Sequence, residues 1–87
     1  MSPNHTDSYS KVYFSPGHSW VEVIGDRYTD LDLFVYDEDN RMVLIDSDTD
    51  ATDHCVVRFY VKEPGTCTIQ IRNLGGAYNH YLLRTSD

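Results

Sequence analysis

The sequence predicts an all-β protein, a small antiparallel β-sandwich of jelly-roll or Greek-key type with about seven strands. Short runs rich in Val, Ile, Tyr, Phe and Thr alternate with turn-forming clusters at intervals of roughly 6–12 residues. Within the runs apolar residues recur at every second position, which is the period of a strand. No apolar pattern with the helical period near 3.6 is sustained. At 87 residues the chain makes one domain.

Each expected strand ends at a turn signal. The first two runs are separated by Ser15-Pro16-Gly17, and Gly25-Asp26 ends the second. The third and fourth form a hairpin about Asp39-Asn40. An acidic loop follows, then a run that ends at Glu63-Pro64-Gly65, and Gly75-Gly76 precedes the last run. The expected strands are 9–14, 19–25, 30–37, 42–46, 54–61, 66–72 and 78–84.

Residues 1–8 are polar, and we expect a disordered or poorly ordered tail there, with residues 9–87 as the single sandwich domain. Alternation assigns the inward faces to Val12, Phe14, Val21, Val23, Leu31, Leu33, Val35, Cys55, Val57, Phe59, Val61, Cys67, Ile69, Ile71, Tyr81 and Leu83. The opposite, solvated faces carry Asp32, Arg58, Thr68, Gln70, Arg72 and Arg84.

Charge is concentrated in one region. The chain has 14 acidic and 7 basic residues, a net charge of -7. Residues 26–53 hold ten acids against Arg27 and Arg41, whereas the remainder holds four acids against five bases. A phosphate backbone or an anionic bilayer would be repelled, so nucleic-acid and membrane-surface binding are disfavoured.

The chain contains no stretch of the ~18 consecutive apolar residues that a transmembrane helix needs, and its first ten residues lack the regions of a signal peptide. We expect the chain as given to be soluble. If it is a piece of a larger precursor, the absent signal says nothing about the parent protein.

The order of several local signatures resembles one known family. These are Asp30 to Asp37 with the turn Glu38-Asp39-Asn40, the acidic Asp46-Ser47-Asp48, Val56 to Val61 running into Glu63-Pro64-Gly65-Thr66, and the closing Tyr78 to Leu83. Together they resemble the bacterial pre-peptidase C-terminal (PPC) domain, a β-sandwich appended to secreted hydrolases and other exported proteins. The resemblance covers residues 19–85.

The resemblance implies a non-catalytic accessory module that supports the folding, secretion or substrate engagement of a parent protein, and collagenase-type relatives bind calcium and collagen. Its partner would be a catalytic or structural domain of its own parent chain, secreted or periplasmic as part of a larger precursor. Two alternatives stay open: a module that binds an extracellular polymer such as collagen or a polysaccharide, and a structural domain that self-associates through an edge strand. A monomer or a weak oligomer is expected.

Six aspartates are candidate calcium ligands. If the hairpin turns about Asp39-Asn40, Asp32 falls opposite Ser47 and Asp30 opposite Thr49, so two acidic stretches meet at one end. Calcium takes six to eight oxygens, which carboxylates and loop carbonyls can supply. The alternative is a solvated acidic loop in which aspartates cap turn amides. The candidates are Asp30, Asp32, Asp46, Asp48, Asp50 and Asp53.

An EF-hand is excluded, although Asp46, Asp48 and Asp50 superficially match the start of its loop. Ala51 stands where that loop requires glycine, and Val57 stands where it requires a bidentate glutamate.

Cys55 and Cys67 both fall at inward positions. A disulfide between strands or sheets is one interpretation, and two buried thiols acting as small hydrophobic side chains are the other. A zinc site is disfavoured because His54 points away from Cys55 and the chain has no CxxC motif.

Four aromatic side chains are expected opposite the core, where they form a candidate binding surface for an extended polymer. The alternative is packing between aromatic neighbours or cover from a second domain. They are Trp20, Phe34, Tyr36 and Tyr60.

No constellation in the sequence predicts an enzyme. Asp30 and Asp32 lie two apart on one strand with no cleft around them, and His18 beside Ser19 is not a nucleophile elbow. Catalysis needs a nucleophile, a base and a stabilising group in one pocket.

Overall fold

Seven strands and one short 3-10 turn make up the fold in the computed structural model, which describes residues 1–26, 30–48, 53–77 and 79–87, with the backbone alone at Asn40 and Val43. The strands are β1 (Thr6–Phe14), β2 (Gly17–Gly25), β3 (Leu31–Asp37), β4 (Val43–Asp48), β5 (His54–Val61), β6 (Gly65–Asn73) and β7 (Tyr81–Thr85), and η1 (Glu38–Asn40) links β3 to β4. None of the described residues belongs to a helix long and apolar enough to span a membrane.

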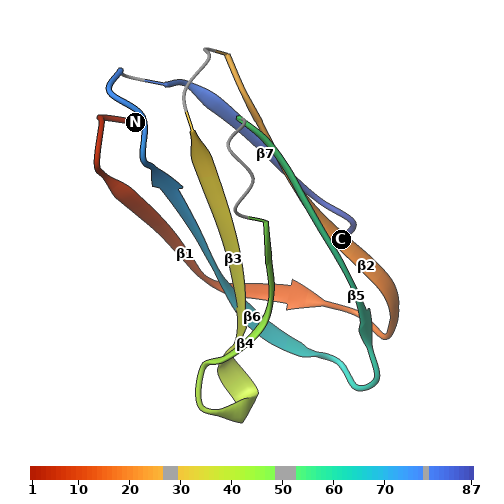
Figure 1. The fold of residues 1–87 in the computed structure, drawn as a ribbon. Coiled ribbons are helices and arrows are strands. Elements are labelled where there is room, and N and C mark those ends of the chain that lie inside the picture. The colour runs from red at the N-terminus through yellow and green to blue at the C-terminus, as the bar shows by residue number, and fades with distance from the viewer. Residues whose placement is uncertain (27–29, 49–52, 78) are drawn as a thin grey trace.

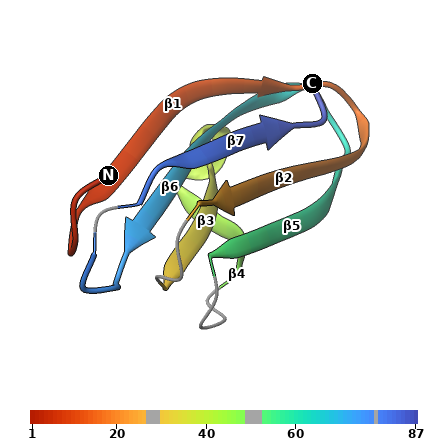
Figure 2. The same ribbon diagram turned by 90° about the horizontal axis from the view of Figure 1, so that it is seen from above.

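The strands form two antiparallel sheets that face each other (Figure 1). One sheet has the order β1-β6-β3-β4 and the other the order β5-β2-β7. Figure 2 views the two sheets from above. One cluster of buried side chains fills the interior between them. Neighbours in each sheet are mostly distant in sequence, as in a Greek key. The predicted all-β sandwich with seven strands is confirmed.

The interior is filled by the side chains that alternation places inward. Eleven are buried and five more pack against them partly buried, and these sixteen match the predicted set. Phe14 and Phe59 meet edge to face, with ring centroids 5.2 Å apart. Met1 is the one addition, since its side chain packs against this core.

Two side chains expected on solvated faces are buried. Asp32 is 7% exposed and Thr68 is 5% exposed. Thr68 is covered because η1 folds over β6 and its Oγ1 donates to Glu38 Oε2 at 2.6 Å. Alternation predicts the face of a sheet, but it does not show which positions on that face a turn will cover.

The β3–β4 register differs from the predicted one by two positions. Ser47 lies opposite Phe34 instead of Asp32, and Asp48 lies opposite Leu33. The connection is longer than expected because Arg41 and Met42 follow η1 with left-handed φ angles of 53° and 59°. A bulge between Val35 and Tyr36 shifts the register further.

The N-terminal segment differs from the expected poorly ordered tail. β1 begins at Thr6, and the backbone before it continues toward β6: the Asn4 N–H donates to the Asn73 carbonyl at 2.7 Å, and the Asn73 N–H donates to the His5 carbonyl at 3.0 Å. Composition suggested a tail because these side chains are polar, but backbone pairing does not depend on side-chain polarity.

Candidate functional site

The most unusual polar group lies where β3 begins. Asp30 and Asp32 are two residues apart, so their side chains project to the same face. One carboxylate oxygen of each, Oδ1, is buried without a hydrogen-bond partner among the described residues. Burial in the first place, and the neighbouring charge of Asp30 in the second, raise the pKa of Asp32.

The pair has two ways to reduce its repulsion. Asp30 is close enough to accept a hydrogen bond from a protonated Asp32, so one shared proton would satisfy both groups. A cation between the two carboxylates would do the same at neutral pH. Arg72, which lies opposite Asp32 on β6, lowers the pKa of Asp32 but does not cancel the rise.

Asp48 and Asp53 lie at the same end of the sandwich. Asp48 ends β4, and its Oδ2 accepts a hydrogen bond from the Val56 N–H of β5 at 2.9 Å. Asp53 precedes β5, and its carbonyl accepts from the Gly25 N–H at 2.8 Å. Both carboxylates therefore belong to the acidic end, which we define as Asp30, Asp32, Asp48 and Asp53.

The remaining two predicted ligands are placed differently. Asp46 lies further along β4, opposite Val35, and its Oδ1 accepts from the Ser47 N–H at 2.8 Å. Asp50 lies outside the described residues. Within the described ranges, no three His, Cys, Asp or Glu side chains form a group that could hold a metal ion as they stand.

The buried thiol of Cys55 confirms that these acids share one neighbourhood. Burial raises its pKa to about 12, and the charges of Asp48, Asp32, Asp30 and Asp53 contribute to the rise. The Sγ–H donates to the Leu31 carbonyl at 3.0 Å. A thiol held protonated in this way is unreactive at neutral pH.

Of the two interpretations of Cys55 and Cys67, the structure shows the second, since both are buried free thiols. Cys55 contacts Leu31 at the start of β3, whereas Cys67 is paired with Asp37 at its end. Six residues of strand separate these positions, about 20 Å. Bridged cysteines need Cα atoms within roughly 7 Å of each other. Alternation was right that both point inward, but it carries no information on which end each occupies.

A second group of carboxylates lies at the opposite end, around η1, and its members are hydrogen-bonded. Glu38 accepts from the Lys11 N–H at 2.7 Å and from the hydroxyls of Thr66 and Thr68 at 3.1 and 2.6 Å. The bond from Thr68 and then that from Lys11 lower the pKa of Glu38. Asp39 accepts from the Thr66 N–H at 3.2 Å. We call Asp37, Glu38 and Asp39 the clasp.

A cavity of about 410 Å³ opens beside the clasp, between η1 and the β5–β6 turn. Phe14, Phe59 and Cys67 are among the residues that line it. Burial raises the pKa of the Cys67 thiol to about 11. The carboxylates at its rim bind turn amides, since Asp37 Oδ1 accepts from the Asp39 N–H at 2.9 Å. The carboxylates at the rim of this cavity therefore stabilise a turn.

The predicted aromatic surface is divided between the two outer faces. Phe34 and Tyr36 lie on β3, stacked with centroids 6.4 Å apart, and Arg72 lies 4.7 Å above the Phe34 ring. Trp20 and Tyr60 lie on β2 and β5 in the other sheet. A single stripe of all four is therefore wrong, because consecutive segments of this fold enter different sheets.

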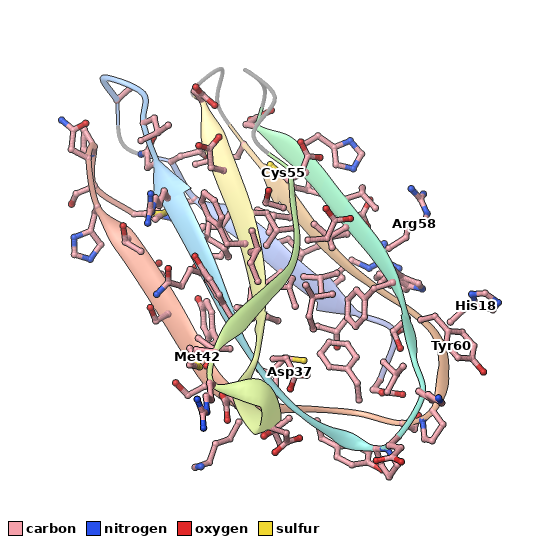
Figure 3. The ribbon with its side chains drawn as sticks, turned by 60° about the horizontal axis from the view of Figure 1, so that its bottom comes forward. His18, Asp37, Met42, Cys55, Arg58 and Tyr60 are labelled. Carbon is pink, nitrogen blue, oxygen red and sulfur yellow. The ribbon has the colours of Figure 1, made fainter. Side chains whose placement is uncertain are left out.

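Trp20 and Tyr60 lie beside an arginine and a histidine on the outer face of their sheet. The ladder places Trp20 opposite Arg58 and His18 opposite Tyr60. The rings of His18 and Tyr60 meet edge to face at 5.2 Å. Figure 3 shows His18, Arg58 and Tyr60 projecting outward from these strands, with Cys55 and Asp37 at opposite ends of the molecule.

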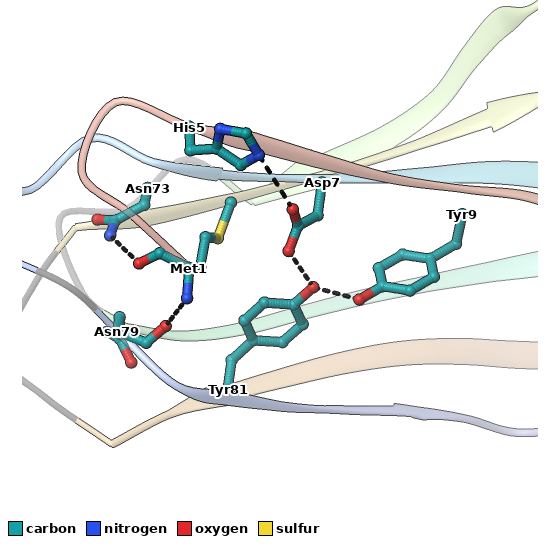
Figure 4. Close-up of polar contacts among 7 residues, drawn as sticks. All are labelled: Met1, His5, Asp7, Tyr9, Asn73, Asn79 and Tyr81. Carbon is teal, nitrogen blue, oxygen red and sulfur yellow. Dashed lines mark hydrogen bonds and ion pairs between the residues drawn. The ribbon is translucent and has the colours of Figure 1, made fainter.

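Sequence reasoning missed a polar network that joins β1 to β7 across the open side of the sandwich (Figure 4). The Tyr81 hydroxyl donates to Asp7 Oδ2 at 2.7 Å and contacts the Tyr9 hydroxyl. Burial in the first place, then these two contacts, raise the pKa of Tyr81. Because β1 and β7 are edge strands of different sheets, the network closes the sandwich there.

Two fully buried asparagines organise the loops near this network. Asn73 Nδ2 donates to the Ala77 carbonyl at 2.9 Å, and Asn79 Oδ1 accepts from the Asp26 N–H at 3.0 Å. The signal that could have pointed to them is the turn pair Gly75-Gly76, since asparagine beside a turn commonly binds its backbone.

The similarity of this chain to known proteins lies in its fold. No protein-family model matches the chain, and the search of curated proteins finds no match. A solved structure that it resembles is the pre-peptidase C-terminal domain of a collagenase from Bacillus anthracis. The TM-score is 0.69 at 14% sequence identity, and the match covers 99% of this chain and 91% of that one. The chain therefore has the fold of a pre-peptidase C-terminal domain.

Proposed function

We propose that this chain is a non-catalytic accessory module of an exported protein, in which it supports the folding, secretion or substrate engagement of a neighbouring domain. The observation that carries the proposal is the fold, which matches the pre-peptidase C-terminal domain of a collagenase over nearly the full length of both chains. The clasp and the polar network between β1 and β7 fit a stable module, since their groups satisfy one another.

The coding region around this segment tests the accessory role. We expect an export signal and an attached catalytic or structural domain in the same reading frame. A reading frame that holds this module alone, without a leader or a neighbour, would contradict the proposal.

Calcium at the acidic end is the second part of the proposal. Asp30 Oδ1 and Asp32 Oδ1 are buried oxygens for which the described part of the chain supplies no donor, and a hard cation would supply a positive partner. Asp48 lies near enough for its charge to contribute to the raised pKa of Asp32. With calcium bound, the site would stabilise the folded state, because the ligand binds only that state.

Isothermal titration of the metal-free protein with calcium chloride tests this site. We expect one calcium ion per chain, with the heat of binding lost in Asp32→Asn. A matched control is Asp46→Asn, whose carboxylate binds its neighbouring amide and should leave the titration unchanged. A titration that gives no heat in the parent protein, confirmed by equilibrium dialysis, removes calcium from the proposal.

Polymer binding is a second candidate function, favoured by the exposed aromatic face of the β5-β2-β7 sheet. An open groove of about 440 Å³ runs over His18, Trp20 and Tyr60 there. Tyr60 is 66% exposed, so its ring is available to a partner. Co-sedimentation with insoluble collagen and polysaccharides tests this role, and retention of the parent protein but not of Tyr60→Ala supports it.

A further inference from the structure

The two sheets of the sandwich carry opposite charge. The strands β2, β5 and β7 hold Arg58 and Arg84 against one acid, Glu22, which is +2 and -1 and gives +1. The strands β1, β3, β4 and β6 hold two basic residues against five acids, +2 and -5, which gives -3. In a chain of net charge -7, the three-stranded sheet is therefore the one that can approach an anion.

Arg58 is the residue on that sheet best placed to bind one. Arg84 is already engaged, since its Nη1 lies 3.6 Å from Glu22 Oε1 and its guanidinium lies 5.7 Å above the Trp20 ring. Arg58 is exposed, and its side chain makes no hydrogen bond or ion pair among the residues that the structure describes. Its guanidinium can form a bidentate pair with a carboxylate.

The groove beside Arg58 supplies apolar ring faces. It is lined by His18, Ser19, Trp20, Arg58, Phe59 and Tyr60. Tyr60 is the most exposed of the large hydrophobic side chains that the structure describes, and its ring contacts the His18 ring. An open groove of this kind suits a rigid ring that stacks on an aromatic side chain, while the adjacent arginine binds a charged substituent.

An extended peptide fits this face less well. Peptides that bind sheets add a strand at an edge, where backbone donors and acceptors are free. β2 is the central strand of its sheet and pairs with β5 and β7, so the face presents side chains and few unpaired backbone groups. The ligand has to be recognised by stacking and by charge.

We propose that the outer face of the β5-β2-β7 sheet binds an acidic polysaccharide, with a sugar ring stacked on Tyr60 and its carboxylate paired with Arg58. This inference rests on the second candidate function, polymer binding, and names the class of polymer. The acidic sheet lies about 10 Å behind this face, so its repulsion of an anion is weaker here than at its own surface.

Affinity electrophoresis with three soluble polymers tests the proposal. The probes are polygalacturonate, dextran as an uncharged polysaccharide, and poly-L-glutamate as a polyanion without sugar rings. We expect retardation by polygalacturonate, weaker as salt rises, and at least tenfold weaker retardation by the other two. Arg58→Gln and Tyr60→Ala should each weaken the binding of polygalacturonate about tenfold, as expected for the loss of one charge-assisted hydrogen bond or stacked ring.

Matched variants remove the same chemistry elsewhere. Arg41→Gln lies in the turn after η1, and Tyr13→Ala removes a ring that is 55% exposed on β1 in the other sheet. Both should bind polygalacturonate like the parent protein, and circular dichroism should show all four variants folded.

The outcomes distinguish a failure of the acidic-polysaccharide inference from a failure of the polymer-binding function. Equal binding of poly-L-glutamate would overturn the inference because charge alone would then suffice. Equal binding of dextran would overturn it but leave polymer binding standing. If neither these probes nor insoluble collagen and polysaccharides bind, the inference and the polymer-binding function both fail.

Discussion

The two ends of β3 carry the same kind of residue in opposite circumstances. Asp30 and Asp32 at its start have buried oxygens without partners within the described ranges, whereas Glu38 just beyond its end accepts three hydrogen bonds. The pKa of Asp32 is raised and that of Glu38 is lowered. The difference lies in the donors: threonine hydroxyls and free amides surround the clasp, while the nearest neighbours of Asp32 include another carboxylate.

A buried thiol lies near each end, and nearby carboxylate charges contribute to the raised pKa of both thiols. The pKa of Cys55 under the acidic end rises to about 12, and that of Cys67 near the clasp to about 11, with burial the first cause of both. Clustered acid is therefore not itself evidence of a cation site. What distinguishes the acidic end is that Asp30 Oδ1 and Asp32 Oδ1 are buried without a donor among the residues that the structure describes.

The two ends should differ in how they tolerate a methyl group. A Cβ at Gly25, at the acidic end, would lie 2.8 Å from the Cβ of Asp53 and from Asn79 Nδ2, which is fully buried. Gly25→Ala should therefore lower the free energy of unfolding by about 1–3 kcal/mol, as overpacking does. Urea denaturation measures it.

The matched variant is at the clasp. A Cβ at Gly65 would overlap the Asp39 carboxylate, whose end can swing away at the loss of its bond to Thr66. Gly65→Ala should cost about 1 kcal/mol. If it costs as much as Gly25→Ala, the clasp is as rigid as the acidic end, which contradicts the comparison.

Removing the charge of Asp32 should stabilise the metal-free protein. An amide at this position can donate to the Asp30 carboxylate, which replaces a repulsion with a hydrogen bond. In a chelator at pH 7, Asp32→Asn should raise the free energy of unfolding by about 1 kcal/mol, the lower part of the cost of a buried unpaired polar group. Chemical denaturation that shows a loss of stability instead would mean that Asp32 already has a partner.

The two ends should respond to acid in opposite directions. Asp32 has a pKa raised above its ordinary value of 3.8, so the folded state takes up its proton first, and metal-free stability should rise as the pH falls through the raised pKa toward 3.8. Glu38 has a pKa below its ordinary value of 4.5, so its contribution is full above 4.5 and is lost as the pH falls through the lowered pKa.

Melting temperatures of the metal-free protein between pH 7 and pH 3 measure both effects. Asp32→Asn should remove the rise on mild acidification, and Glu38→Gln should lower the melting temperature at pH 7 and flatten the fall at low pH. Profiles of the two variants that coincide would show that the two ends do not titrate differently.

The sequence predicts the fold well because strand periodicity and turn residues are local. All sixteen inward side chains were predicted, from Val12 on the first strand to Leu83 on the last. The errors concern features that depend on contacts between segments distant in sequence. The turn after η1 and the bulge at Val35 moved the β3–β4 register, and Cys55 and Cys67 lie on strands of different sheets at opposite ends.

The sequence predicted which acidic residues form the site, but it did not predict their hydrogen-bond environment. Asp30 and Asp32 were found because two like charges at strand spacing must share a face. Their missing donors could not be found, because donors depend on which segments approach from other strands. The same limit explains why Trp20 and Tyr60 were assigned to one surface with Phe34 and Tyr36, which lie on the other sheet.

The central claim is that the acidic end needs a cation and the clasp does not. Thermal melting with calcium and with chelator, for the parent protein, Asp32→Asn and Glu38→Gln, tests it most directly. Calcium at about 100 times its dissociation constant would add about 2.7 kcal/mol to a folded state that binds it. We predict a higher melting temperature with calcium in the parent protein and in Glu38→Gln, and coincident melts in Asp32→Asn. An equal shift in Asp32→Asn, or coincident melts in the parent protein, would contradict it.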